Sequence, residues 1–438
     1  MLQRRLGVLD LTLITIGAVI GSGIFRTPAI VAQHAHSTPL ILLCWLIGGI
    51  MAIIGAFVFA ELAARRPADV GIYAYLRDAF HPLVGFLLAW SALTMTYVGS
   101  TAAAAALFAA YLLPLVGLHF DPRIVAVTAI AIVTLINVLG VRQGGTWQNI
   151  LVALKVFGIA AVIVTGVLIA HPLPSELPAF APFTTPGSAI AAIGIAMLPV
   201  LFSYNNFQAA TLVASETVDP GRTIPLGQII GMLVVLATYL LASIAYLHVL
   251  SAPALAHSST PASDVMRAAF GAPGAAVVAA VIAISTLGFM SNAVLLAPRL
   301  YFQMADDGLF FKQFAWVSPK ARVPVVAIAV HGAIAAIIAA SGTYEQILNW
   351  ISLWPWIFIG LAACAVFIFR RRDAGLPRPA FVVPLHPWST VLLIATIAAI
   401  SIAVVVQAPL DALYGTIVMI AGILFYSIWK AVHARTAA

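Results

Sequence analysis

The chain has 438 residues, of which 63% are hydrophobic and only 8% are charged. Soluble globular domains are about half apolar and about one-quarter charged, so this composition excludes a soluble enzyme or binding module and predicts an integral membrane protein. The formal net charge is +7, which an excess of Lys and Arg in the loops on one side of the bilayer would explain.

Apolar runs long enough to cross a bilayer follow one another along nearly the whole chain. A spanning helix needs about 20 apolar residues. On this measure the sequence predicts twelve spans, at residues 8–34, 39–64, 82–113, 122–140, 145–170, 189–214, 225–251, 273–300, 323–341, 345–369, 388–407 and 410–430. Both cysteines, Cys44 and Cys364, fall inside these runs, which argues against a disulfide framework.

The first predicted span is interrupted by glycine. Gly17, Gly21 and Gly23 stand close together, and Ser22 lies among them. Each glycine costs a helix interior about 1 kcal/mol relative to alanine. Unwound backbone is tolerated in hydrocarbon only where it is buried in protein or lines a cavity. The pattern therefore predicts a broken helix at a transport site near the bilayer midplane, with close helix packing at small residues as the alternative.

The sixth predicted span is interrupted at a comparable place. The segment from Pro199 to Gln208 contains Ser203, Asn205 and Asn206 in an otherwise apolar run. Because an offset of five spans is odd, the first and sixth spans enter the bilayer from opposite faces. Paired broken segments in corresponding positions of two halves predict a substrate site between them.

Two charged residues, Lys155 and Arg26, fall well inside the predicted spans. Lys155 lies about ten residues into the fifth span, which is about 15 Å from its start and near the midplane. A charge at this depth predicts a functional site, with a structural tie between helices as the alternative. Arg26 either orients anionic groups in an outer vestibule or pairs with a lipid phosphate or a helix carbonyl.

The remaining basic residues predict the orientation. With the N-terminus taken as cytoplasmic, nearly all of them fall on cytoplasmic loops, and only Arg123 and Arg267 fall outside. The positive-inside rule then places both termini in the cytoplasm. Four charged residues lie near the predicted cytoplasmic helix ends: Glu61, Glu216, Asp219 and Arg222. An inner-gate ion network and stabilisation of helix ends are both open for them.

Further motifs accompany the two breaks: Gly21-Ser22-Gly23-Ile24-Phe25, Glu61-Leu62, Gly71-Ile72-Tyr73-Ala74-Tyr75, Phe202-Ser203-Tyr204, Glu216 with Asp219-Pro220, Arg222 and Ile224-Pro225, and, more weakly, Pro298-Arg299-Leu300 and Arg370-Arg371-Arg372. Together they resemble the amino acid-polyamine-organocation superfamily of permeases, and within it the prokaryotic relatives of the light-chain L-amino acid transporters. The resemblance implies an all-α membrane protein with a LeuT-like fold of 12 transmembrane helices. Helices 1 and 6 would be broken, and two extra helices would follow five-plus-five inverted repeats. A single transport domain, residues 1–438, would divide into repeats at 1–171 and 172–372 and helices 11 and 12 at 373–438.

A zwitterionic amino acid presents a carboxylate and an ammonium, which unwound backbone can bind without charged side chains. The outward half of the first span begins near Ser22, so we expect the N–H groups of Ser22, Gly23 and Ile24 to bind the carboxylate at the positive end of the helix dipole. The resemblance implies that four carbonyls bind the ammonium: those of Val19, Phe202, Ser203 and Asn205. It also implies that the Phe202 ring gates access from outside.

The resemblance also implies a role for Lys155. It is similar to a lysine that, in sodium-independent relatives, occupies the position of a coupling sodium between helices 1 and 8. Its ammonium would bond carbonyls near Gly17 and Ala18 and the Ser285 hydroxyl, and it could carry a coupled proton.

The chain departs from those relatives at Asn205-Asn206, where they usually carry a glycine pair. Asparagine tolerates left-handed backbone better than other non-glycine residues, so the break can persist. The larger side chains narrow the pocket or add amide contacts. This difference favours small or polar neutral substrates.

The sequence therefore predicts a secondary active transporter of small neutral L-amino acids in the inner (cytoplasmic) membrane, which works by alternating access through sodium-independent exchange or proton-coupled symport. A cationic amino acid or polyamine carrier and a sensor with a transporter fold are the alternatives. An enzyme is excluded because the spans carry no catalytic constellation. No metal or other cofactor is expected, since the ten histidines lack metal-ligand spacing. The expected partners are the amino acid, protons and lipid, not nucleic acid; a heavy-chain subunit is not expected, because the loop at 114–121 has no cysteine.

Overall fold

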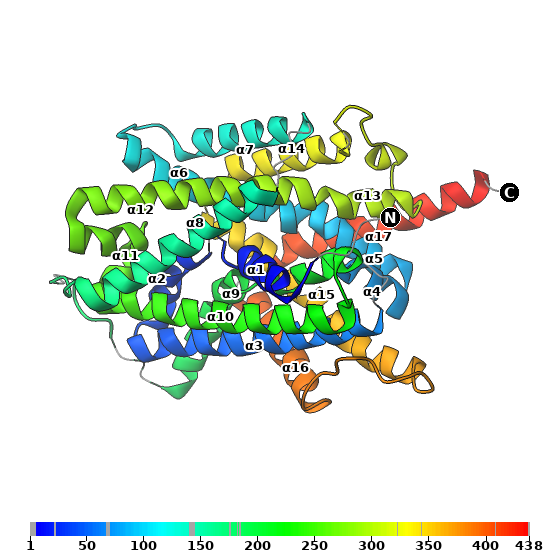
Figure 1. The fold of residues 1–438 in the computed structure, drawn as a ribbon, viewed down its shortest axis with the longest axis horizontal. Coiled ribbons are helices and arrows are strands. Elements are labelled where there is room, and N and C mark those ends of the chain that lie inside the picture. Colours follow the sequence, from blue (N-terminus) through cyan, green and yellow to red (C-terminus); the bar gives the residue numbers. More distant parts are fainter. Residues whose placement is uncertain are drawn as a thin grey trace.

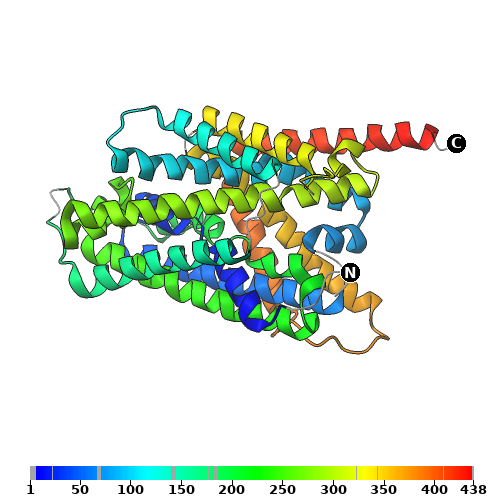
Figure 2. The same ribbon diagram turned by 45° about the horizontal axis from the view of Figure 1, so that its top comes forward.

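The computed structural model describes residues 6–21, 23–66, 71–139, 145–174, 177–181, 183, 185–321, 323–342, 344–407 and 409–436. Within them the chain is helical, and the β-type contact present is an isolated bridge between Leu6 and Thr217. Most of the long helices run along the length of the molecule (Figures 1 and 2). The expected all-α architecture is therefore confirmed for the described residues.

The elements are, in chain order, α1 (Val8–Val19), α2 (Gly23–Ala35), α3 (Thr38–Arg65), α4 (Gly71–Ala79), α5 (Pro82–Ser91), η1 (Ala92–Thr96), α6 (Tyr97–Val116), α7 (Pro122–Val138), α8 (Gly145–Val164), η2 (Thr165–Ile169), α9 (Pro186–Ser203), η3 (Phe207–Glu216), α10 (Pro220–Val249), α11 (Ala252–His257), α12 (Pro261–Leu296), α13 (Pro298–Asp306), η4 (Lys312–Ala315), α14 (Val325–Ser341), α15 (Tyr344–Arg372), α16 (Trp388–Gln407) and α17 (Pro409–Thr436). Here η1 and η2 are π-helical, and η3 and η4 are 3₁₀-helical.

The apolar helices match the predicted spans in position. In the described part of the chain, eight are long and apolar enough to cross a membrane, and the bent pair α1 and α2 makes a ninth if it is one span. Three shorter apolar helices, Pro122–Val138, Ala153–Ile169 and Val325–Ser341, coincide with the other three predicted spans. The structure thus confirms a polytopic helical protein with at least eight membrane-capable helices.

Helices from the two predicted halves pack against each other. α3 packs on α10 along one edge of the molecule, and α7 packs on α14 along the opposite edge, with α12 and α8 between these edges (Figure 1). Small residues allow this packing: a Cβ on Gly332 of α14 would lie 2.2 Å from Thr134 Oγ1 of α7, so no side chain fits there. Close approach at small residues is the usual way in which membrane helices associate. The packing leaves α1 and α9 in the interior, where the two interruptions lie.

Candidate functional site

The first predicted interruption is present. α1 ends at Val19, α2 begins at Gly23, and the two helices are bent by 47°. Ile20, which follows α1, has φ −70° and ψ 89°, outside the helical region. Gly23 and Ile24 stand in the first turn of α2, where a helix provides no internal acceptor for the N–H groups. Ser22, the third predicted donor to a carboxylate, lies outside the described residues.

The second interruption follows Ser203, the last residue of α9. A turn at Tyr204–Asn206 leads into η3, and Asn206 has φ 70° and ψ 13° in the left-handed region. The Asn206 N–H donates to Asn205 Oδ1 at 2.8 Å, and the Asn205 N–H donates to the Phe202 carbonyl at 3.1 Å. The asparagine pair therefore supplies both the left-handed residue and a side-chain acceptor for the turn, as expected from asparagine's tolerance of this conformation.

The two interruptions meet in space. A Cβ on Gly23 would lie 2.4 Å from Ser203 Oγ and 2.9 Å from Ser203 Cα, so only glycine fits at the start of α2. The hydroxyl of Tyr239 on α10 lies 3.0 Å from the Val19 carbonyl and 3.0 Å from the Ser203 carbonyl. A tyrosine hydroxyl has one proton and can donate to one carbonyl at a time. Two carbonyls of separate broken helices thus converge on one point, with acceptor capacity left for a cation.

Tyr239 was not predicted from the sequence. It is a fully buried tyrosine in an apolar helix, and its local sequence carries no signal of contact with both breaks. Its assignment depends on the packing of α10 against α1, which only the tertiary structure provides.

Lys155 lies on α8 with 3% of its surface exposed. Its Nζ donates to the Gly17 carbonyl at 3.1 Å and to the Ile20 carbonyl at 2.9 Å. Gly17 is an expected partner, whereas Ile20 is not; the chain leaves the helix after Val19, and this frees the last carbonyls of α1 for the ammonium. Ala18 and Ser285, which we also expected here, make no hydrogen bond to Nζ within the described residues. The lysine therefore joins α8 to the unwound end of α1.

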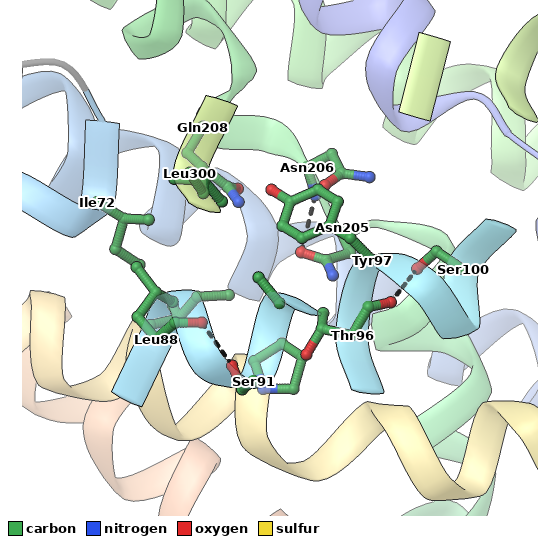
Figure 3. A pocket seen from close by; sticks show the side chains of 13 residues that line it. Ile72, Leu88, Ser91, Thr96, Tyr97, Ser100, Asn205, Asn206, Gln208 and Leu300 are labelled. Carbon is green, nitrogen blue, oxygen red and sulfur yellow. Dashed lines mark hydrogen bonds between the residues drawn. The ribbon is translucent and has the colours of Figure 1, made fainter. Parts of the chain in front are cut away.

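A pocket with polar groups in a mostly apolar wall lies beside the second interruption, and we call it the η1 pocket (Figure 3). It holds about 500 Å³ of space, including its opening to solvent. The lining residues are Ile72, Leu88, Ser91, Ala92, Thr96, Tyr97, Ser100, Asn205, Asn206, Gln208, Leu300, Pro355 and Ile359. Among the predicted substrate residues that the structure describes, Asn205 belongs to this lining, whereas Val19, Gly23, Ile24, Phe202 and Ser203 do not.

The pocket wall contains unused hydrogen-bonding capacity. Thr96 Oγ1 and Gln208 Oε1 are buried and have no hydrogen-bond partner among the residues that the structure describes. Thr96 ends η1, the π-helical segment between α5 and α6, and such segments often occur at functional sites. Because buried polar atoms nearly always have a hydrogen-bond partner, these two mark a part of the wall that can bind a polar group. The sequence signal for this wall is the series of hydroxyls at Ser91, Thr96 and Ser100 in the third apolar run.

An ion network fastens α3 to α15. The Glu61 carboxylate is fully buried and accepts from Arg65 Nε at 2.8 Å, from Arg370 at 2.8 and 2.6 Å, and from the Val383 N–H at 2.7 Å. Asp373 pairs with Arg65 at 3.3 Å in the same network. Glu61 therefore takes part in an ion network that joins two helix ends, which is compatible with both roles that were open for it.

The other predicted charged residues stand elsewhere. Asp219 precedes α10, and its carbonyl accepts the N–H of Arg222 at 3.0 Å; the side chain of Glu216 lies outside the described residues. The Arg26 guanidinium on α2 donates to the carbonyl of Ser258, which follows α11. The acceptor is thus a backbone carbonyl just after a helix, whereas the expected alternatives were a vestibule role and pairing with a lipid phosphate or a helix carbonyl. In the part of the chain that the structure describes, no group of His, Cys, Asp and Glu could hold a metal ion.

Comparison with known proteins identifies the class. The family model described as amino acid permease matches residues 6–426, nearly the whole chain. The chain therefore belongs to the amino acid permease family of the amino acid-polyamine-organocation superfamily. More particularly, it is an amino acid transporter of the membrane, and its relatives are transporters rather than enzymes.

Three relatives illustrate the similarity. The b(0,+)-type amino acid transporter 1 of Homo sapiens is 30% identical over 437 residues, which cover 97% of this chain and 88% of that protein. The serine/threonine exchanger SteT of Bacillus subtilis (strain 168) is 29% identical over 402 residues, covering 90% of this chain and 89% of the relative. The large neutral amino acids transporter small subunit 2 of Mus musculus is 28% identical over 401 residues, which cover 88% of this chain and 74% of that protein.

Proposed function

We propose that this transporter carries small, polar, neutral L-amino acids by sodium-independent exchange or proton-coupled symport. The observation that carries the proposal is the convergence of the Val19 and Ser203 carbonyls at the meeting point of the two interruptions. Freed backbone groups at a pair of broken helices are the usual means by which such transporters bind a zwitterion.

In the proposed binding mode, the carboxylate lies at the N-terminus of α2 and the ammonium lies against the converging carbonyls. The N–H groups of Ser22, Gly23 and Ile24 bind the carboxylate, which the positive end of the helix dipole favours. The carbonyls of Val19, Phe202, Ser203 and Asn205 bind the ammonium. Tyr239 donates to one of these carbonyls at a time, that of Val19 or that of Ser203, and the Phe202 ring closes the site from outside.

The η1 pocket supports a neutral substrate with a small polar side chain. Its wall offers hydroxyl and amide groups at Ser91, Thr96, Asn205 and Gln208, and none of the described lining residues is charged. A cationic side chain would leave its charge without a carboxylate partner there, which is costly away from water. The name of the serine/threonine exchanger SteT describes substrates of this chemistry for that relative.

We propose that Lys155 carries a coupled proton at the first interruption, or that its ammonium occupies the position of a coupling sodium there. Its two hydrogen bonds, to the Gly17 carbonyl near the end of α1 and to the Ile20 carbonyl after it, support this role because they bring a charge to the first interruption. Charge-assisted hydrogen bonds contribute about 1.5–3 kcal/mol each, and 1.4 kcal/mol corresponds to a tenfold effect. Lys155→Ala should therefore lower exchange at least about tenfold or abolish its pH dependence, while Lys320→Ala, at an exposed loop lysine, should leave both unchanged. Full activity with the parent's pH dependence would exclude this role.

We propose a LeuT-like fold with 12 transmembrane helices, in which residues 1–171 and 172–372 form inverted repeats and residues 373–438 add two helices. Three packed pairs support it, because each joins helices five spans apart: α3 with α10, α6 with α12 and α7 with α14. A short helix also follows each member of one pair, α4 after α3 and α11 after α10.

We further propose that both termini are cytoplasmic in an inner membrane and that the chain works without a heavy-chain subunit. The distribution of Lys and Arg over the loops supports the orientation. Cys44 and Cys364 lie within α3 and α15, away from the loops where an intersubunit disulfide would form.

The decisive experiment is uptake of labelled amino acids into proteoliposomes that contain the purified protein. Serine, threonine and alanine should be taken up, with dependence on internal amino acid for exchange or on an inward proton gradient for symport. Selective uptake of arginine or a polyamine would overturn the substrate assignment and leave the fold argument intact. Uptake that requires sodium would contradict the proposed role of Lys155.

A further inference from the structure

His331 on α14 is fully buried and forms the centre of a hydrogen-bonded cluster outside the substrate site. Its Nε2 lies 3.0 Å from Thr101 Oγ1 on α6, and its Nδ1 lies 3.1 Å from the Tyr301 hydroxyl on α13. Both hydroxyls have a second neighbour. The Tyr301 hydroxyl lies 3.0 Å from the Ala92 carbonyl, and Thr101 Oγ1 lies 3.0 Å from the Tyr97 carbonyl.

The four contacts together require a definite number of protons. The two contacts to backbone carbonyls require that the tyrosine and threonine hydroxyls donate, because a carbonyl can only accept. Each hydroxyl then has only lone pairs left for the ring, so both ring nitrogens must donate. A neutral imidazole has one N–H and an imidazolium has two. All four hydrogen bonds therefore form together only when His331 carries an added proton, and the neutral ring leaves one of them unmade.

The cluster is connected to the η1 pocket through η1 itself. Ala92 is the first residue of η1 and lines the pocket, as do Thr96 and Tyr97. The Ala92 carbonyl accepts the Tyr97 N–H, which closes the π-helical turn, as well as the Tyr301 hydroxyl. Leu300, the residue before Tyr301, also lines the pocket. A change in the hydrogen bonding of the cluster therefore reaches the pocket wall through Tyr301 and Ala92.

The groups that face the ring are neutral. Thr101 and Tyr97 come from α6, Tyr301 comes from α13, and on α7 Thr134 packs against Gly332, the residue next to His331. Within the described residues, the charged side chains of the elements packed on α14 make no hydrogen bond or ion pair with the ring: Arg123 on α7, Asp264 and Arg267 on α12, Arg299 and Asp306 on α13, and Lys312 on η4.

We propose that the cluster of His331, Tyr301 and Thr101 is a proton-binding site that positions η1, and through it the pocket wall, in the transport cycle. The proton binds to the ring nitrogen that holds a lone pair in the neutral ring, and no covalent bond of the protein breaks. His331 is a positioning residue, because it acts on the pocket through Tyr301 and Ala92. This site is separate from Lys155 and does not depend on which amino acid is carried.

The test follows two readouts from about pH 4 to about pH 9, the range over which histidine commonly titrates. The first is the protonation of the ring in the purified full-length protein labelled with ¹⁵N-histidine, where the signal that disappears in His331→Gln identifies the residue. The second is exchange of labelled serine in proteoliposomes. We expect the His331 signal to titrate in the pH range where the parent's exchange rate changes, by about threefold to tenfold for one hydrogen bond, and we expect this change to be absent in His331→Gln.

Matched variants keep the test informative if His331→Gln does not fold. Thr101→Val removes the second acceptor, so an added proton no longer completes the cluster and the pH response should be lost. Thr101→Ser retains the hydroxyl and should keep the response, as should His171→Gln at an exposed histidine. A ring that stays neutral throughout, or a pH profile in folded Thr101→Val equal to that of the parent, would overturn the proposal. The histidine signal is measured without substrate, so its outcome is independent of the substrate assignment.

Discussion

Replacing Glu61 by glutamine should destabilise the protein by about 3 kcal/mol. The carboxylate is fully buried and accepts four hydrogen bonds, three from Arg65 and Arg370 and one from the Val383 N–H. Glutamine keeps the shape but removes the charge and turns one oxygen into a donor that faces other donors. Removing one member of a buried ion pair costs about 3–5 kcal/mol. The Arg370 side chain is 28% exposed, so water compensates part of this loss and the lower value applies.

The assay is thermal unfolding of the purified protein in detergent. An unfolding entropy of about 2.1 cal/mol/K per residue gives about 0.9 kcal/mol/K for 438 residues, so the expected decrease in Tm is about 3 °C. Asp306→Asn, at an exposed carboxylate, is the control and should unfold with the parent. If Glu61→Gln unfolds at the parent's temperature, the carboxylate does not hold α3 to α15, and the reasoning from its four contacts is wrong.

Three further predictions concern single residues. Asn205→Gly should widen the substrate range toward larger side chains, and an unchanged uptake profile across a panel of amino acids would contradict this. Tyr239→Phe removes the donor shared by the two converging carbonyls and should raise the KM for serine by up to about tenfold, the effect of one hydrogen bond, with the amount of folded protein as the control. The hydrogen bond from Arg66 lowers the pKa of Asp373, so its carboxylate stabilises the fold above the pKa of the unfolded chain, and this contribution is lost as the pH falls through the lowered value. Asp373→Asn should therefore lower Tm at pH 7, and this decrease should become smaller as the pH falls below about 3.9, the pKa of an unperturbed aspartate. A decrease in Tm that stays equal from pH 7 into acid would refute the assignment.

The positions of the two breaks and of the buried lysine along the chain were largely predictable, because the sequence signals for them are local. Glycine in an apolar run predicted the break after Val19, and the Asn205-Asn206 pair predicted left-handed backbone at the second break. A lysine deep in an apolar helix predicted an intramembrane contact, and Gly17 was named correctly as one partner of Lys155. Each of these features depends on the cost of an unusual residue in a helix or in hydrocarbon, which can be estimated without knowing the neighbours.

Pairing between distant segments was not predictable to the same degree. The second carbonyl at Lys155 is that of Ile20 because of where the helix unwinds, and Tyr239 meets both breaks because α10 packs beside α1. Likewise, Glu61 is surrounded by arginines from two helix ends, and His331 meets Tyr301 and Thr101 from three different elements.

The sequence by itself thus determined the membrane setting and the two interruptions, because composition and local backbone cost are properties of the chain. Only the tertiary structure decided which groups face one another, since hydrogen-bond partners depend on how helices far apart in the sequence pack together.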